Sequence, residues 1–124
     1  MREAAALLSA EPSLAAEPAW DPRAFQALAR EIGADGAGEV RAVFWSETDA
    51  RLKLFGDLPL AQQRARIERE AHSLKSAART FGYQWLAALA QQLEQNATAL
   101  DDASYRKLLD AMAKAYAAAR DEDA

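Results

Sequence analysis

Apolar residues recur at intervals of three and four along most of the chain, which is the spacing of one face of an α-helix. No stretch alternates apolar with polar residues in the manner of a β-strand. Alanine is abundant, whereas the chain has only 5 glycines and 4 prolines, a composition that favours helix. The pattern therefore predicts an all-α protein.

Capping signals bound the first expected helices. Asp21 and Pro22 predict an N-cap followed by proline at the first helical position, and Gly33 predicts the end of this helix near Ile32. A second helix is expected over residues 38–55. The residues predicted to form its buried side are Val40, Val43, Phe44, Leu52 and Phe55.

A third helix is expected to start near Asp57 or Leu58, with Pro59 in its first turn, and to end at Gly82. Its apolar spacings alternate between three and four residues, which is typical of a seam packed inside a helical bundle. Arg64 interrupts that seam near the start of the helix. The seam residues are Leu60, Ile67, Ala71, Leu74, Ala78 and Phe81.

Two more amphipathic helices follow, the first with an apolar stripe from Leu86 to Leu100 and the second starting at Asp101 or Asp102. Four long helices with short connections predict an antiparallel four-helix bundle. We expect the helix over residues 22–32, and a short one over residues 4–9, to pack across an end of it. Residues 1–19 are interpreted as an N-terminal extension that is either a short helix or disordered, and residues 20–124 as the bundle.

Composition excludes several classes of site. The chain has no cysteine and one histidine, which excludes disulfides, thiolate metal sites and a histidine-rich metal site. Its net charge of −4 gives no reason to expect nucleic-acid binding. Residues 1–18 are interrupted too early by charge and proline to form a signal peptide or membrane anchor. We therefore expect a cytoplasmic protein that binds no membrane.

The single histidine, His72, does not belong to the apolar seam. At about 100° per residue, His72, Ser76 and Arg79 lie on one flank of the third helix, with Lys75 nearer the seam and Glu68 one turn earlier. A lone surface histidine is usually only a polar residue. An exposed imidazole with cations and a small residue at these spacings, however, suits the binding of a phosphoryl group.

The string His72-Ser73-Leu74-Lys75-Ser76-Ala77-Ala78, followed by Phe81-Gly82 and by the leucine-rich run from Leu86 to Glu94, resembles the histidine phosphotransfer (HPt) domain of bacterial phosphorelays. The family has the same number and order of helices. Two positions depart from its pattern. Ser76 stands where glycine is usual, and Arg79 stands where a small residue is frequent.

The resemblance implies a phosphocarrier that has no ATP-dependent kinase activity of its own. His72 would accept a phosphoryl group through Nε2, Lys75 would neutralise its charge, and Glu94 would orient the imidazole. Glu94 could instead be a plain surface charge. Partner binding is assigned to Ser76, Arg79, Glu68 and Ala71. Arg79 sets partner choice in one interpretation and is a solvated charge in another.

The implied partners are response-regulator receiver domains and a hybrid histidine kinase. The receiver would bring Mg²⁺, while this chain would need no cofactor or metal and would act as a monomer. Ala77 and residues of the second helix could add apolar contacts. Trp45 and Trp85 are candidates for the same surface, although tryptophan in a small bundle more often belongs to the core.

Two alternatives remain open. The first is a helical adaptor of the same fold whose histidine is never phosphorylated, an idea that Ser76 supports. The second is the dimerisation and phosphoacceptor part of a histidine kinase. Kinases of that type place an acidic residue directly after the histidine and a proline soon afterwards, whereas here Ser73 follows and no proline occurs after Pro59.

Overall fold

The computed structural model describes residues 14 and 16–123 of the chain, and within this part every regular element is an α-helix. The predicted all-α class is therefore confirmed. The helices are α2 (Pro22–Ile32), α3 (Ala34–Asp57), α4 (Leu60–Phe81), α5 (Gln84–Asn96) and α6 (Asp102–Asp123). The short helix expected over residues 4–9 lies outside the described residues.

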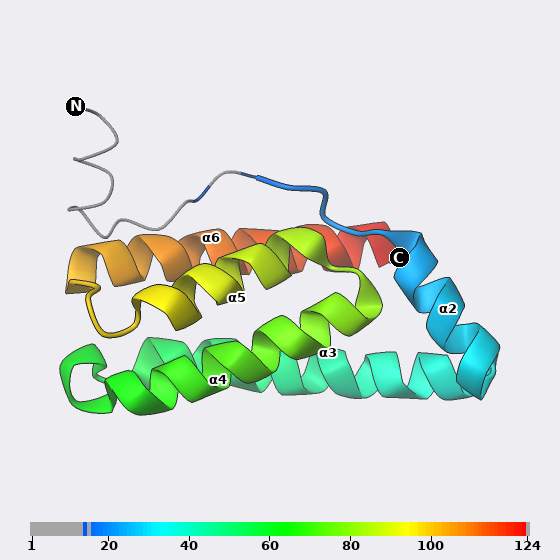
Figure 1. Ribbon diagram of the computed structural model, residues 1–124, viewed down its shortest axis with the longest axis horizontal. Coiled ribbons are helices and arrows are strands. Elements are labelled where there is room, and N and C mark those ends of the chain that lie inside the picture. The colour runs from blue at the N-terminus through cyan, green and yellow to red at the C-terminus, as the bar shows by residue number, and fades with distance from the viewer. Residues whose placement is uncertain (1–13, 15, 124) are drawn as a thin grey trace.

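The four long helices form a closed ring. α3 packs on α4, α4 on α5, α5 on α6, and α6 again on α3. Successive helices run in opposite directions, and α2 crosses the end of the bundle where α4 turns into α5 (Figure 1). The predicted antiparallel four-helix bundle, with the helix over residues 22–32 across one end, is confirmed. None of the described helices has the length and apolarity needed to span a bilayer.

The core lies along the axis of the ring. All six predicted seam residues of α4 are buried, and Ile67, Ala71, Leu74 and Ala78 have no exposed surface. The stripes of α5 and α6 meet them through Leu86, Leu93, Leu108 and Met112, which are also fully buried. Large apolar side chains that interlock in this way provide most of the favourable free energy of folding.

Side-chain caps and one glycine set the helix ends as the sequence predicts. Asp21 Oδ1 accepts a hydrogen bond of 3.0 Å from Arg23 N at the start of α2. Asp101 Oδ1 likewise accepts one of 2.7 Å from Ser104 N before α6. Gly82 ends α4 in the left-handed region, with φ 83°, which glycine adopts without steric cost.

The ends of α3 and the start of α4 differ from the prediction. α3 begins at Ala34 rather than near residue 38, because the fully buried Ala37 packs into the core and outweighs the low helix propensity of the neighbouring glycines. α3 also continues to Asp57, and α4 starts at Leu60, with Pro59 as its N-cap. A proline can precede a helix because its missing N–H needs no partner there.

The end of α5 also differs. The helix stops at Asn96, although the apolar stripe predicted for it continues to Leu100, which is buried in the connection to α6. Arg64 Nη1 donates to the carbonyl oxygens of Ala97 and Leu100 at 2.8 and 2.9 Å. Arg64, which interrupts the apolar seam of α4, thus supplies hydrogen bonds to backbone carbonyl groups that follow α5.

Two residues assigned to the buried side of α3 are exposed. Val40 is 44% and Val43 53% exposed, whereas Phe44 and Phe55 are buried as predicted. The side that faces the core instead carries the small Ala37 and the polar Thr48, each fully buried. Hydrophobicity alone therefore misplaced two of the five residues predicted for the buried side.

Candidate functional site

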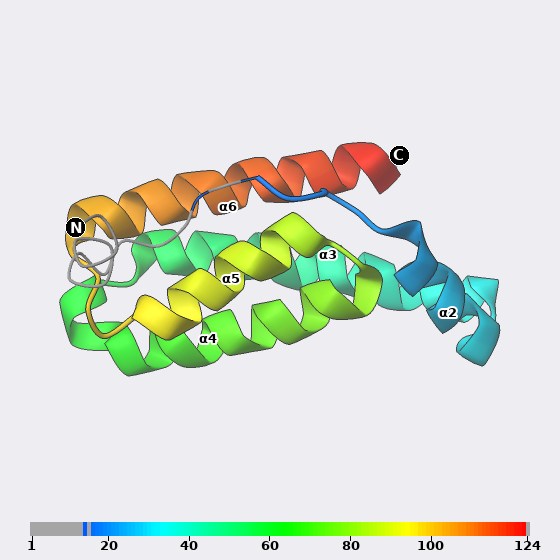
Figure 2. The same cartoon turned by 45° about the horizontal axis from the view of Figure 1, so that its top comes forward.

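α4 and α5 lie side by side in both views of the ribbon (Figures 1 and 2). His72 lies near the middle of α4, which runs from Leu60 to Phe81. Ala71 and Leu74 are buried on the inner face of α4, so His72, which follows Ala71, points outward. The side chain of His72 is 60% exposed, as the helical spacing predicts. A rigid two-helix surface thus presents the imidazole to solvent.

Glu94 of α5 joins two side chains of α4. Its neighbour Leu93 is buried, which places Glu94 at the margin of α5 that faces α4. Glu94 Oε2 lies 2.7 Å from His72 Nδ1, and Glu94 Oε1 lies 2.6 Å from Lys75 Nζ. Only 16% of the Lys75 side chain is exposed, so its ammonium is directed along the helix pair toward this carboxylate.

The electrostatics of this cluster fix the proton on the imidazole. Contact with the Lys75 ammonium lowers the pKa of Glu94, and the hydrogen bond with His72 lowers it further, against the opposing effect of burial. Glu94 is therefore a carboxylate, which can only accept hydrogen bonds. His72 Nδ1 must then be the donor, so a neutral ring keeps its lone pair on Nε2, away from Glu94.

The remaining predicted binding residues divide into exposed and buried ones. Glu68, Ser76 and Arg79 are exposed on α4. Arg79 Nη2 donates a 2.6 Å hydrogen bond to Gln91 Oε1 of α5, which holds the guanidinium over the helix pair. Ala71 has no exposed surface, so its assignment to partner binding is wrong: it packs within the seam.

The two tryptophan side chains considered for the surface pack against the core instead. Trp45 is half-buried, and its ring lies 4.8 Å from that of Tyr83 and 5.5 Å from that of Tyr116, measured between centroids. Trp85 is half-buried on α5. These contacts favour the interpretation that both tryptophans belong to the core and not to a binding surface.

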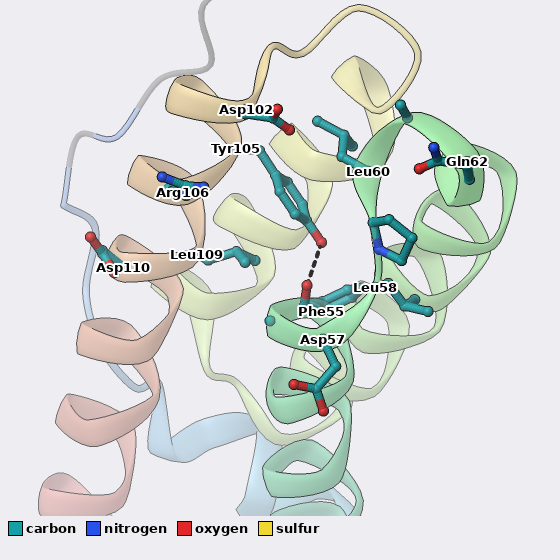
Figure 3. Close-up of a pocket in the computed structure, with 13 residues that line it drawn as sticks. Phe55, Asp57, Leu58, Leu60, Gln62, Asp102, Tyr105, Arg106, Leu109 and Asp110 are labelled. Atoms are coloured by element: carbon teal, nitrogen blue, oxygen red, sulfur yellow. Dashed lines mark hydrogen bonds between the residues drawn. The ribbon is translucent and has the colours of Figure 1, made fainter.

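A hollow of about 670 Å³ lies at the end of the bundle opposite α2, between the α3–α4 connection and the start of α6 (Figure 3). The side chain of Tyr105 lines this hollow, and its Oη donates a 2.9 Å hydrogen bond to the carbonyl oxygen of Phe55. None of the residues predicted for the functional site lines it. Within the described part of the chain, no three metal-ligating side chains gather into a metal site.

The family resemblance predicted the contact between His72 and Glu94, but sequence reasoning missed the contacts that Lys75 and Arg79 make with α5. The ion pair between Lys75 and Glu94, and the hydrogen bond between Arg79 and Gln91, both cross from α4 to α5. The sequence contains one signal for them, because Gln91 and Glu94 are three residues apart and therefore share a face of α5. It does not reveal which residues of α4 lie opposite that face.

Comparison with known families identifies the chain. The family model described as the Hpt domain matches residues 39–122, which cover α4, α5 and most of α3 and α6. Comparisons with curated proteins and with solved structures gave no match. Hpt domains carry phosphoryl groups in phosphorelays and are not themselves kinases. The match spans more than half of the sequence and contains the His72 cluster, and the chain therefore belongs to the Hpt domain family.

Proposed function

We propose that this chain is a phosphorelay intermediate in which His72 takes a phosphoryl group from the aspartyl-phosphate of one receiver domain and passes it to the aspartate of another. One observation carries the proposal: the exposed imidazole has its Nδ1 2.7 Å from the carboxylate of Glu94. That geometry keeps a lone pair on the other nitrogen, on the solvent side of the helix.

The transfer is a substitution at phosphorus. The lone pair of His72 Nε2 attacks the phosphorus atom, the Nε2–P bond forms, and the bond between phosphorus and the aspartyl oxygen breaks. The bonding electrons leave with the oxygen and regenerate the receiver carboxylate. The proton on Nδ1 stays in its hydrogen bond with Glu94, whose negative charge compensates the positive charge that the ring gains.

Lys75 has two tasks in this proposal. In the resting chain its ammonium pairs with Glu94 Oε1 and keeps the carboxylate ionised and oriented toward the imidazole. When Nε2 carries a phosphoryl group, the same ammonium is close enough along α4 to compensate the added negative charge, since residues three apart share a helix face.

Phosphoryl transfer depends mainly on alignment and charge compensation. The receiver partner, from a response regulator or a hybrid kinase, would bring Mg²⁺ together with its own carboxylates. This chain then supplies a nucleophile on a rigid surface and requires no cofactor of its own. The exposed Ser76 leaves room for the partner near His72 and adds a hydroxyl able to donate to a phosphoryl oxygen.

Transfer from a phosphorylated receiver tests the proposal. The wild-type chain should gain a label that resists alkali and is lost in acid, as expected for a P–N bond. A His72→Gln variant should gain none, while an Arg106→Gln variant, changed at an exposed position of α6 beside the hollow, should behave as the wild type. Label on the His72→Gln variant, or no label on the wild type with any receiver of the same organism, would refute it.

The second candidate is an adaptor that binds receivers without being phosphorylated. Ser76 favours it, because a side chain one turn beyond His72 occupies space that glycine would leave open for the partner. A Ser76→Gly variant separates the two functions. If the serine blocks transfer, the variant should gain label where the wild type gains none, whereas comparable labelling of both chains supports the phosphorelay function.

A further inference from the structure

The acceptor for the imidazole lies in the last turn of a helix. Glu94 is two residues before Asn96, where α5 ends. The carbonyl groups of a last helical turn have no partner inside the helix, and such turns open easily unless contacts from elsewhere hold them. Glycine ends many helices by turning the chain, but here Ala97 follows in the right-handed conformation, with φ −54°. The turn that carries Glu94 therefore depends on contacts from outside α5.

A single guanidinium of α4 holds this end of α5. Arg64 Nη1 donates to the carbonyl oxygen of Ala97 at 2.8 Å and to that of Leu100 at 2.9 Å. Both accepting residues are buried, so their carbonyl groups need a partner within the protein. A cation at the C-terminal end of a helix also interacts favourably with the helix dipole. Arg64 thus fixes the chain just after Glu94 to the helix that carries His72.

The place of Arg64 in the sequence favours this role over simple packing. It interrupts the apolar seam of α4 between Leu60 and Ile67, where an apolar side chain would remove more apolar surface from water. The half-burial of a cation costs free energy unless hydrogen bonds compensate for the lost water. The two carbonyl groups that Arg64 reaches therefore account for an arginine at this position.

Three cationic side chains of α4 contact α5 in antiparallel order. The pairs are Arg64 with Ala97 and Leu100, Lys75 with Glu94, and Arg79 with Gln91. Lys75 and Arg79 contact side chains, which can follow them if the helices shift. Arg64 contacts the backbone, so of the three contacts it is the one that fixes the chain of α5 itself.

We infer that Arg64 is a positioning residue for phosphoryl transfer, an inference that rests on the proposed function. It fixes the last turn of α5 and thereby holds Glu94 at the 2.7 Å distance from His72 Nδ1. Without the guanidinium, the two carbonyl groups lose their donor, the last turn opens to water, and Glu94 spends part of its time away from the imidazole. The proton is then no longer confined to Nδ1, so fewer molecules have a lone pair on Nε2.

Arg64→Met tests the inference, because methionine fills irregular space in a core but has no hydrogen-bond donor. Arg66→Met is the matched control, at an exposed position of the same helix. Long-range ¹H–¹⁵N NMR correlations of the neutral imidazole show which nitrogen carries the proton, and this measurement needs no receiver. Initial rates of transfer from a phosphorylated receiver give kcat and KM.

We expect Arg64→Met to move part of the His72 proton population from Nδ1 to Nε2 and to lower kcat about threefold, with KM unchanged. The fall in kcat is smaller than for loss of the carboxylate, because Lys75 still contacts Glu94. Arg66→Met should match the wild type. Arg64→Lys, which retains a cationic donor, should restore the proton position and kcat toward the wild-type values.

A tautomer ratio or a kcat equal to that of the wild type overturns the inference, even where the free energy of unfolding has fallen, because Arg64 would then only stabilise the fold. If Arg64→Met does not fold, Arg64→Gln, which also lacks the charge, takes its place in the same comparison. A wild type that no receiver labels refutes the proposed function, and the tautomer ratios then still decide whether Arg64 positions Glu94.

Discussion

Lys75 Nζ lies 2.6 Å from Glu94 Oε1, on the same carboxylate whose other oxygen accepts the imidazole hydrogen bond. One anionic group thus serves two partners on the neighbouring helix. Replacing either end of the ion pair changes the environment of His72 without touching its ring, which makes the relationship accessible to experiment.

Glu94→Gln tests the orienting role. The amide keeps the shape of the carboxylate, but it carries no charge and can turn its NH₂ group toward Nδ1, which would disfavour the productive tautomer. We expect kcat for transfer from a receiver to fall by roughly tenfold or more, with KM little changed, because the isosteric change leaves the exposed side chains of α4 around His72 in place.

The matched control for Glu94→Gln is Gln95→Glu, a charge change at the exposed neighbouring position of α5. It should leave both constants near the wild-type values. A Glu94→Gln chain that transfers at the wild-type rate would show that orientation of the ring does not depend on the carboxylate.

Lys75→Gln tests the electrostatic effect on Glu94. Contact with the Lys75 ammonium is the largest cause of the lowered pKa, so the variant should show a Glu94 pKa shifted up from the wild-type value. A ¹³C NMR titration of the side-chain carboxyl group measures it directly. The same Glu94 pKa in both chains would contradict the ion pair.

The lowered pKa of Glu94 also makes stability depend on pH. A carboxyl group whose pKa is lower in the folded state contributes stability that is present above its unfolded value, near 4.5, and is lost as pH falls through the folded value. Denaturant unfolding of the wild type at pH 6 and at pH 3 should show this loss. Lys75→Gln should reduce the difference between the two conditions.

Gly82→Ala tests the turn that brings α5 back against α4. Gly82 has φ 83°, and a Cβ there would lie 2.3 Å from the carbonyl oxygen of Asp21. The variant combines an unfavourable backbone conformation with a backbone clash, so the free energy of unfolding should fall by about 2 kcal/mol or more. Denaturant unfolding followed by circular dichroism gives the value.

Gly38→Ala is the matched control for that change. Gly38 is inside α3 and has open space around its Cα, so alanine should raise the free energy of unfolding by about 0.5–1 kcal/mol. Opposite signs for the two glycines are expected. A Gly82→Ala chain as stable as the wild type would contradict the left-handed turn.

These glycines illustrate what the sequence could predict. The end of α4 was predictable, because Gly82 directly follows a regular apolar seam and a glycine at that position is a local signal for the end of a helix. The start of α3 was not, because Ala37 is helical only through its packing in the core. The exposure of Val40 and Val43 has the same origin: burial depends on which neighbours cover a side chain, and sequence spacing does not contain that information.

In the candidate site, too, features set within one helix were predictable from the sequence, whereas contacts between helices were not. The position of His72 on the outer flank of its helix follows from the spacing of Ala71 and Leu74 within one element. The contacts of Glu94 and Gln91 depend on the register between α4 and α5, which tertiary packing sets. Without the family resemblance, the sequence would have singled out His72 but given no partner for its Nδ1.

Tyr105→Phe tests the bond that ties α6 to the end of α3. The buried hydroxyl donates to the carbonyl oxygen of Phe55, and its loss should lower the free energy of unfolding by about 1 kcal/mol. Burial also raises the pKa of Tyr105 to about 12. The folded chain then keeps this proton between pH 10 and 12 while the unfolded chain releases it, so stability contributed by the phenol is lost as pH rises through that window.

Unfolding of both chains at pH 9 and pH 11 checks the two effects together. The wild type should lose more stability than Tyr105→Phe over this interval, because the variant lacks the group that ionises. Tyr116, whose pKa burial also raises to about 12, remains in both chains and so cancels in the comparison. Equal losses in the two chains would mean that the Tyr105 phenol ionises as readily in the folded bundle as in the unfolded chain.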